Sequence, residues 1–352
     1  MRAFVYTSQP SRVVFRAGAL DDLGAEIERL GAHRALVLST PEQRASAEDV
    51  SKRLGARSAG IYDKAVMHVP IETAEAAREM AKSSNADCCV AIGGGSTIGL
   101  GKAIALTSDL PILAIPTTFA GSEMTPIYGI TEQGQKKTGR DARVLPKTVI
   151  YDPLLIMTLP VRIAGPSGMN AIAHCVEALY APDGNPITSL MAEEGIRTLA
   201  SSLPLMVMEP QNLEARADAL YGAWLSGACL GNVGMALHHK LCHTLGGSYD
   251  LPHAQTHTVV LPHAVHYNRD AAPKAMIRIT LALEGADPAG GLYDLAKAIG
   301  APVALRDLGM KESALDEAAQ LAIRNPYFNP RPVERVAIRQ LLQDAWEGNR
   351  PG

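Results

Sequence analysis

The chain has 352 residues, of which 47% are hydrophobic and 20% charged, and its formal net charge is −3. This length exceeds one ordinary hydrophobic core, so we expect two domains. The slightly negative charge and the lack of a basic run argue against nucleic acid or an anionic membrane surface as a partner.

The five cysteines are odd in number and show no C-x-x-C pairing, which is typical of reduced thiols rather than a disulfide framework. The first residues contain no apolar signal-peptide region, so we expect a cytoplasmic protein. Residues 219–237 lack charge over 19 positions, but glycines interrupt them. We interpret this run as a buried core helix and not as a membrane span.

The first 150 residues alternate between short apolar runs and segments with helical spacing. We expect strands at residues 13–18, 34–40, 59–62, 87–92, 111–115 and 147–151, and helices at 20–30, 43–54, 72–83 and 96–105. Continuous apolar runs of this length are typical of parallel strands buried on both faces. The pattern predicts a Rossmann-like parallel α/β domain over residues 1–160, with ligands near the carboxyl ends of its strands.

A glycine-rich turn at the end of one predicted strand indicates a dinucleotide. Glycines there let the backbone approach a pyrophosphate, and the following helix offers free N–H groups. The loop after the second strand lacks the acidic residue that normally binds the ribose of NAD, so we expect NADPH to be accepted as well as NADH. The candidate cofactor residues are Gly93, Gly94, Gly95, Ser96, Thr117, Thr118, Ser122 and the loop Ser39, Thr40 and Pro41.

Beyond residue 160 only helical periods remain, so residues 161–352 are predicted to form an all-helical domain. The expected helices are residues 167–180, 189–202, 213–236, 274–283, 292–299 and 333–346.

Histidines concentrate in this second half. His239 and His243 are four apart and would share one helix face, which we expect to end at Gly246-Gly247. Leu251-Pro252 then brings back His253, and Asn170 with His174 repeats the four-residue spacing on another helix. Two helices would therefore direct imidazoles and an amide to one cavity.

These motifs together resemble the iron-containing (group III) alcohol dehydrogenase family over nearly the whole chain. The matching segments are Gly93-Gly-Gly-Ser96, Gly99-Leu-Gly-Lys102, Pro116-Thr-Thr-Phe-Ala-Gly-Ser-Glu123, Asp152-Pro153 and the two histidine segments. The resemblance implies an active site in the cleft between the two domains and a homodimer. It also implies a metal held by one Asp and three His, which here correspond to Asn170, His174, His239 and His253, with His243 as the catalytic histidine.

Asn170 in place of Asp removes an anionic ligand from that site, and Gly99 replaces an Asp of many relatives. Both departures resemble the branch of the family that reduces maleylacetate. That resemblance implies NAD(P)H-dependent reduction of the carbon–carbon double bond of maleylacetate, giving 3-oxoadipate, in bacterial degradation of aromatic compounds. It also implies that no tightly bound metal is needed.

In this hypothesis His243 donates the proton, while His174, His239 and His253 surround the ketone together with Asn170, and Tyr327 is a plausible site-facing phenol. The two substrate carboxylates need cationic partners, among which the sequence does not choose. The candidates are Lys102, Lys136, Lys137, Arg140, Arg143, Lys240, Arg324 and Arg331.

Three alternatives remain open at this point. A metal-dependent alcohol or polyol dehydrogenase would use Asn170 as a fourth ligand. A non-catalytic metal-binding or sensor protein would have no use for the glycine turn. A lyase-type relative resembling dehydroquinate synthase would need an intact metal site, against which Asn170 argues.

Overall fold

The computed structural model describes residues 4, 6–7, 11–133, 135–324 and 327–352. Internal contacts divide the chain into two units. One comprises residues 8–159, and the other comprises residues 160–352 together with the described residues of the first seven. The sequence-based division had assigned those first residues to the α/β domain.

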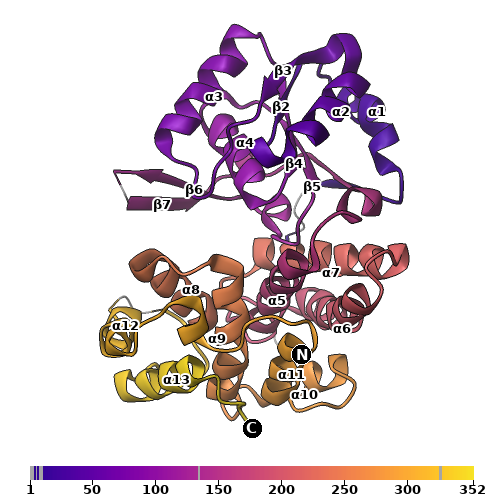
Figure 1. Ribbon diagram of the computed structural model, residues 1–352. Helices are drawn as coiled ribbons and strands as arrows, with labels where there is room; N and C mark the ends of the chain where they lie inside the picture. Colours follow the sequence, from indigo (N-terminus) through magenta and orange to yellow (C-terminus); the bar gives the residue numbers. More distant parts are fainter. Residues whose placement is uncertain (1–3, 5, 8–10, 134, 325–326) are drawn as a thin grey trace. The chain divides into compact units, whose positions relative to one another are not determined.

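The first unit is built on a six-stranded sheet in the order β1-β8-β5-β4-β2-β3, and every pairing in it is parallel (Figure 1). Its strands are β1 (Arg12–Phe15), β2 (Ala35–Leu38), β3 (Ser58–Tyr62), β4 (Cys88–Gly93), β5 (Ile112–Pro116) and β8 (Thr148–Tyr151). The predicted parallel α/β fold is confirmed. The four central strands are buried throughout, as their continuous apolar runs predicted.

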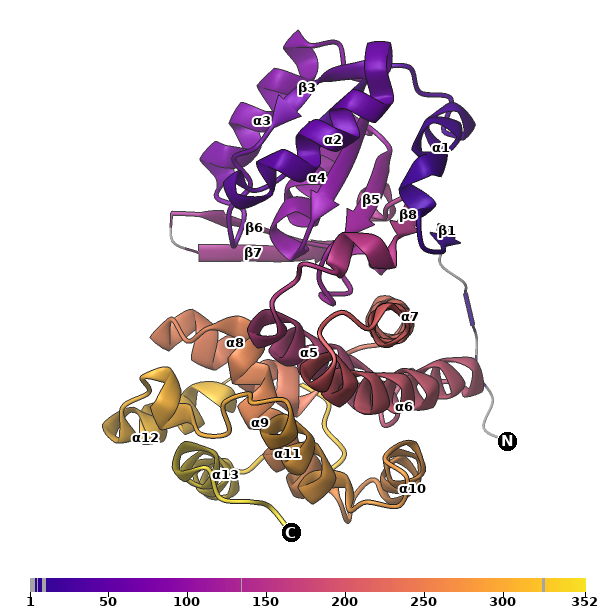
Figure 2. The same ribbon diagram turned by 45° about the vertical axis from the view of Figure 1, so that its right-hand side comes forward.

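Helices cover both faces of this sheet (Figure 2). Helices α1 (Leu23–Arg29) and α2 (Arg44–Leu54) bury Leu23, Ile27 and Val50 against alternate strand residues such as Val37 and Val90. On the other face lie α3 (Ile71–Ser83) and α4 (Gly95–Ser108). Gly101 of α4 faces the side chains of Leu38, Ala91 and Ile112, so α4 packs directly on the strands β2, β4 and β5.

An antiparallel hairpin in this unit was not predicted. It consists of β6 (Ile127–Glu132) and β7 (Gln135–Arg140). The strand β7 reads Gln-Lys-Lys-Thr-Gly-Arg and has no alternating apolar face, so periodicity could not reveal it.

The second unit contains helices only within the described part of residues 160–352. They are α5 (Val161–Ala178), α6 (Pro186–Met208), α7 (Leu213–Asn232), α8 (Leu237–Tyr249), α9 (His253–Asn268), α10 (Pro273–Ala282), α11 (Pro288–Ala298), α12 (Leu315–Ala322) and α13 (Arg335–Glu347). Helix α5 is the most enclosed, being buried from Ala164 to Ala178, and it packs on α6, α7 and α9. The predicted all-helical architecture is confirmed.

Helix α6 packs closely on α7 and on α5 at glycines. A Cβ on Gly222 would lie 2.7 Å from Leu199 Cγ, and one on Gly195 would lie 2.8 Å from Cys175 Sγ. The uncharged run that includes α7 is thus packed among helices, and no described helix is long and apolar enough to span a bilayer.

Several predicted boundaries near the histidines were wrong. Helix α8 does not end at Gly246-Gly247 but continues to Tyr249, because Leu241 and Leu245 pack into a hydrophobic cluster whose burial outweighs the roughly 1 kcal/mol that each helical glycine costs. His253 opens α9, a helix that the sequence analysis did not predict, as it also missed α12. Helix α5 begins six residues earlier than expected, and α7 ends at Asn232 instead of residue 236.

Candidate active site

The predicted cofactor residues gather at the carboxyl edge of the sheet. Strand β4 is hydrogen-bonded to both β2 and β5, so the turns that follow these three strands lie side by side. Strand β3 is added on one side of β2, and β4 and then β5 are added on the other side, so the order of the strands reverses between β2 and β4. In open parallel sheets, ligands bind in the crevice at such a switch point.

The glycine turn leaves no room for side chains. Gly93 has φ 153°, and a Cβ there would lie 2.4 Å from Thr97 Oγ1. A Cβ on Gly94 would lie 2.9 Å from Thr118 Oγ1. The N-cap residue of α4 is Gly94, which has no side chain to bond the first amides of the helix, so they remain available to an anionic group such as a phosphate.

The other predicted cofactor residues differ in how accessible they are. Thr117 Oγ1 accepts a hydrogen bond of 2.7 Å from Gln43 Nε2, which ties the loops after β2 and β5 together. Ser39 is fully buried, whereas Thr40 is half-buried and Pro41 exposed. Ser122 contributes its carbonyl oxygen to Lys102.

Lys102 is not a substrate ligand in this structure. Its ammonium is completely buried and donates to Ser122 O, Thr125 O, Thr125 Oγ1 and Ile127 O, at 2.7–2.9 Å. Burial lowers the pKa of Lys102 to about 7, and these four acceptors exceed the three protons it can donate. The prediction of a substrate contact is wrong because the side chain instead ties α4 to the loop before β6.

In the helical unit, six imidazoles form one contiguous group, which we call the imidazole cluster. It contains His174 of α5, His238, His239 and His243 of α8, and His253 and His257 of α9. Ring centroids of His174 and His239 are 5.0 Å apart, and those of His243 and His253 are 6.4 Å apart. The structure thus brings together the four histidines that the sequence analysis selected.

Exposure changes across the imidazole cluster. His243 and His253 are exposed, His174 and His239 are about 95% buried, and His238 and His257 are inaccessible. Burial, with smaller contributions from neighbouring imidazoles, lowers the pKa of His174 and His257, and it lowers that of His239 to about 3. The inner rings are therefore neutral at physiological pH.

Glu177 is buried next to the imidazole cluster and holds part of it by hydrogen bonds. Its carboxylate accepts hydrogen bonds from Ala236 N and His238 N, both 2.7 Å, at the start of α8, and lies 2.7 Å from His239 Nδ1. Burial raises the pKa of Glu177 to about 7, while these N–H donors lower it. With Glu177 ionised, His239 donates through Nδ1 and presents the lone pair of Nε2. Sequence reasoning missed Glu177, although its position three residues after His174 on the same helix was a usable signal.

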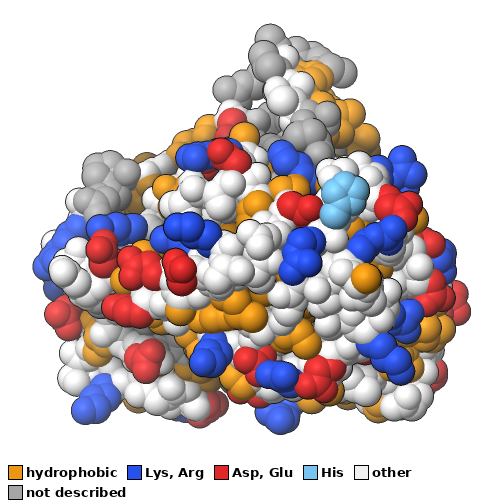
Figure 3. Space-filling view, turned by 90° about the horizontal axis from the view of Figure 1, so that it is seen from above, with side chains coloured by type: hydrophobic (Ala, Val, Ile, Leu, Met, Phe, Trp, Pro, Cys, Tyr) orange, Lys and Arg blue, Asp and Glu red, His pale blue; other side chains and the backbone are white. Residues whose placement is uncertain are grey.

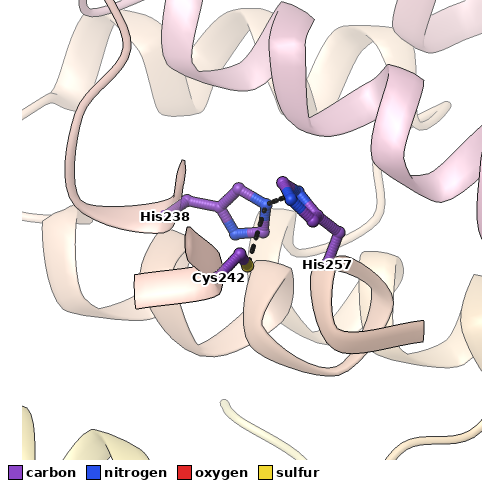
Figure 4. Close-up of side chains that lie close together, drawn as sticks. All are labelled: His238, Cys242 and His257. Atoms are coloured by element: carbon purple, nitrogen blue, oxygen red, sulfur yellow. Dashed lines mark hydrogen bonds between the residues drawn. The ribbon is translucent and has the colours of Figure 1, made fainter. Parts of the chain in front are cut away.

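His238 and His257 form a buried pair behind the exposed His243 and His253, and the sequence analysis did not select either of them. His238 Nε2 is 2.9 Å from His257 Nδ1, and Cys242 Sγ is 3.8 Å from His238 Nε2 (Figure 4). One potential metal-ligand atom from each of His238, Cys242 and His257 lies within 4.8 Å of the other two. The ring of His257 also lies 4.4 Å from that of His253, so this pair packs directly behind the exposed histidines.

Three polar atoms at the positions that correspond to the family's metal ligands are buried without a hydrogen-bond partner among the described residues. They are Asn170 Oδ1, His174 Nδ1 and His239 Nε2. An unpaired buried polar atom costs about 1–3 kcal/mol, so these atoms call for a ligand. Neutral nitrogen and amide oxygen donors fit a divalent transition-metal ion, and the Glu177–His239 pair resembles the support of a metal-binding histidine. The set nevertheless lacks an anionic oxygen.

Tyr327 and Lys240 adjoin each other, with Lys240 Nζ 5.8 Å from the centre of the Tyr327 ring. Arg324 is exposed, and no contact of its side chain with the imidazole cluster is found in the described structure. Of the other cations, Lys137 pairs with Glu132, Arg143 with Asp141, and Arg331 covers the ring of Tyr267. The side chain of Lys136 lies outside the described residues.

Surface charge agrees with the composition. On the face shown in Figure 3, side chains of Lys and Arg alternate with those of Asp and Glu over the coloured area, with no extended zone of one sign. That face offers no basic stripe of the kind that follows a nucleic-acid backbone.

Comparison with known proteins identifies the class. The family profile "Iron-containing alcohol dehydrogenase" matches residues 10–153, and "Fe-containing alcohol dehydrogenase family, C-terminal" matches residues 165–346. The chain therefore belongs to the iron-containing alcohol dehydrogenase family.

Individual relatives narrow this class. The chain is 60% identical to a maleylacetate reductase of Burkholderia cepacia over 351 residues, which covers 100% of both chains. Among solved structures it is similar to maleylacetate reductase from Agrobacterium tumefaciens, with TM-score 0.97 and 53% identity over 100% of both chains. It is also similar to a putative alcohol dehydrogenase from Ralstonia eutropha, with TM-score 0.99 and 60% identity over 100% of both chains.

Proposed function

We propose that this protein reduces the carbon–carbon double bond of maleylacetate to give 3-oxoadipate, with NADH or NADPH as the hydride donor. The observation that carries the proposal is the 60% identity, over the whole of both chains, to the Burkholderia cepacia enzyme of that name. The site agrees with it, because Asn170 leaves the imidazole cluster without the carboxylate ligand of a metal-dependent alcohol dehydrogenase. The likeness favours a cytoplasmic homodimer in the breakdown of aromatic compounds, which light scattering and cell fractionation would test.

The reaction needs a hydride, a proton and stabilisation of negative charge. When held at the turn Gly93–Gly95, NAD(P)H would supply a hydride for the alkene carbon β to the ketone and leave as NAD(P)⁺, and the π electrons of the alkene would then form an enolate. The adjacent carbon then takes a proton to give the saturated ketone. His243 is exposed at the outer side of the imidazole cluster, so it can donate this proton and recover one from solvent.

The buried residues of the site bind the substrate and orient it. Asn170, His174 and His239 present unpaired atoms, and Glu177 holds His239 in one orientation. If a divalent cation is bound, Asn170, His174, His239 and His253 would hold it, and it would act as a Lewis acid. We propose that turnover does not require it, because the conjugated ketone already activates the alkene and because a set without an anionic oxygen binds cations less tightly than one with a carboxylate.

The experiment is to follow NADH oxidation with maleylacetate, using enzyme treated exhaustively with EDTA and the same enzyme supplied with Zn²⁺ or Fe²⁺. We expect equal rates and formation of 3-oxoadipate. Activity that appears only with metal would contradict the metal-independent mechanism, and no turnover in any preparation would contradict the proposed function.

A second candidate is a metal-dependent alcohol or polyol dehydrogenase. The Glu177–His239 hydrogen bond favours it, since a carboxylate behind a histidine is common at metal sites. It predicts oxidation of simple alcohols by NAD⁺ that EDTA abolishes, and the same EDTA and metal preparations assayed with alcohols distinguish it.

A further inference from the structure

The proposed substrate carries two carboxylates, and nothing above assigns a partner to either. The inference that follows rests on the proposed function and concerns Lys240 and Tyr327. Lys240 lies between His239 and His243 on α8 and is half-buried, with no acidic partner for its ammonium among the residues described. Its Nζ lies 5.8 Å from the centre of the Tyr327 ring.

The hydroxyl of Tyr327 differs from those of three other tyrosines of this unit, and among the other described tyrosines of the unit only Tyr180 Oη is buried and unpaired in the same way. Tyr249, Tyr267 and Tyr293 each donate to a backbone carbonyl oxygen, those of Ala314, Pro332 and Gly348. Tyr327 Oη is buried and has no such partner in the described part of the chain. A buried hydroxyl of this kind needs an acceptor, which a bound ligand can supply.

A second lysine–tyrosine pair in the same unit makes the contrast direct. Lys297 Nζ lies 6.0 Å from the centre of the Tyr293 ring, nearly the same geometry. There the tyrosine hydroxyl is satisfied by Gly348 O at 2.8 Å. The Lys240–Tyr327 pair thus differs from the Lys297–Tyr293 pair in its tyrosine hydroxyl, which has no acceptor among the described residues.

Tyr327 also lies in the electrostatic neighbourhood of the imidazole cluster. Burial raises its pKa, and the negative charge of Glu177, which holds His239, raises it further. The ring packs against the hydrophobic cluster that contains Leu237 and Leu241 of α8. The ammonium is therefore carried by the helix that supplies three of the six histidines, and the Tyr327 ring packs on a cluster to which that helix contributes.

We propose that Lys240 and Tyr327 form a subsite for one carboxylate of a dianionic 4-oxo-2-enedioate. The ammonium forms an ion pair with the carboxylate, and the phenol donates a hydrogen bond to it. Charge-assisted hydrogen bonds of this type are about twice as strong as neutral ones. The subsite would orient the conjugated ketone beside His243 without taking part in proton transfer.

The test is a double-mutant cycle with K240M, Y327F and the double variant, and with K297M as the matched control. K240M and Y327F should each raise KM for maleylacetate about tenfold, with a smaller change in kcat and unchanged NADH affinity and Tm. The double variant should raise KM by less than the product of the two, because both groups hold one carboxylate. Unchanged KM, purely multiplicative effects, or an equal rise in K297M would overturn the subsite.

A binding experiment separates failure of this inference from failure of the proposed function. Adipate should raise the Tm of the wild-type protein and of K297M, and it should raise that of K240M less. If the wild type does not reduce maleylacetate yet shows this pattern, only the function fails. If adipate raises the Tm of K240M as much as that of the wild type, the subsite fails whatever the turnover.

Discussion

His239 Nδ1 lies 2.7 Å from Glu177 Oε2, and the same carboxylate accepts the backbone N–H groups of Ala236 and His238. One buried side chain therefore caps the amino end of α8 and sets the orientation of an imidazole in the candidate site. Stability and site geometry are coupled at Glu177, because both depend on the same two oxygens.

Replacing Glu177 with Gln should lower the stability of the protein and disturb the orientation of His239. The amide offers one acceptor oxygen, and its NH₂ group would face an N–H donor, leaving buried groups unpaired at a cost of about 1–3 kcal/mol. We expect a lower free energy of unfolding by denaturant and a loss of turnover. E193Q, which removes the partly exposed partner of Arg278, is the control and should change stability by less than 1 kcal/mol. Wild-type behaviour of E177Q would contradict the role of Glu177.

His243→Asn tests the proton donor. Loss of a general acid should lower kcat for maleylacetate by about 10²–10⁴-fold, while the Kd for NADH, measured by fluorescence, stays within error. H266N replaces an exposed histidine on α9 and should leave kcat unchanged. Equal losses in kcat and in NADH affinity would exclude His243 as the donor.

Asn170→Asp tests whether the missing carboxylate in the histidine site limits metal binding. A carboxylate at this position adds an anionic oxygen to His174, His239 and His253, so the variant should retain Zn²⁺ or Fe²⁺ through dialysis, as measured by mass spectrometry of the metal content. The N170D/H239A double variant should lose the metal again, which would locate it in this set. Equal metal content in N170D and wild type would show that charge at residue 170 does not control binding.

Gly93→Ala tests the cofactor turn. The added Cβ would lie 2.4 Å from Thr97 Oγ1, and φ 153° is unfavourable for an L-residue, so the turn must move. We expect NADH affinity to fall at least tenfold. Gly247 in α8 meets nothing within 4 Å, so G247A should leave NADH affinity unchanged and, by helix propensity, stabilise the protein by up to about 1 kcal/mol. Normal NADH binding by G93A would place the cofactor elsewhere.

Stability should fall on acidification. Burial lowers the pKa of His239 to about 3 and that of His263 to about 4, from an ordinary value of 6.5, and also lowers the pKa of His174, His238 and His257. Below pH 6.5 the unfolded chain therefore binds more protons than the folded one, which destabilises the fold.

Glu177 acts in the opposite direction, because its raised pKa of about 7 favours the fold at low pH and this contribution is lost between 4.5 and 7 as pH rises. The five histidines outnumber it, so Tm should decrease as pH is lowered from 6.5 to 4. Calorimetry at a series of pH values measures this, with H263N expected to show a shallower slope. A constant or rising Tm on acidification would contradict it.

Much of the architecture followed from local patterns. Apolar runs such as residues 35–38 and 88–92 predicted the parallel strands, because a strand buried on both faces has no polar side. The hairpin β6–β7 escaped prediction because β7 has no alternating apolar face, and α9 did so because Pro262 and four histidines obscure its apolar pattern. Gly246-Gly247 led to a helix end that was predicted too early, because burial of Leu245 stabilises α8 through these two glycines.

The sequence by itself determined the α/β and helical halves, the glycine turn, and the four histidines with Asn170. Spacing along a helix or at a strand end is sufficient for each of these. Only the tertiary structure decided that Lys102 is a buried tie, that Glu177 supports His239, and that His238 and His257 lie behind the exposed histidines. These relationships join residues 19–62 positions apart in the chain, or depend on whether a side chain is buried, and local periodicity carries no information about either.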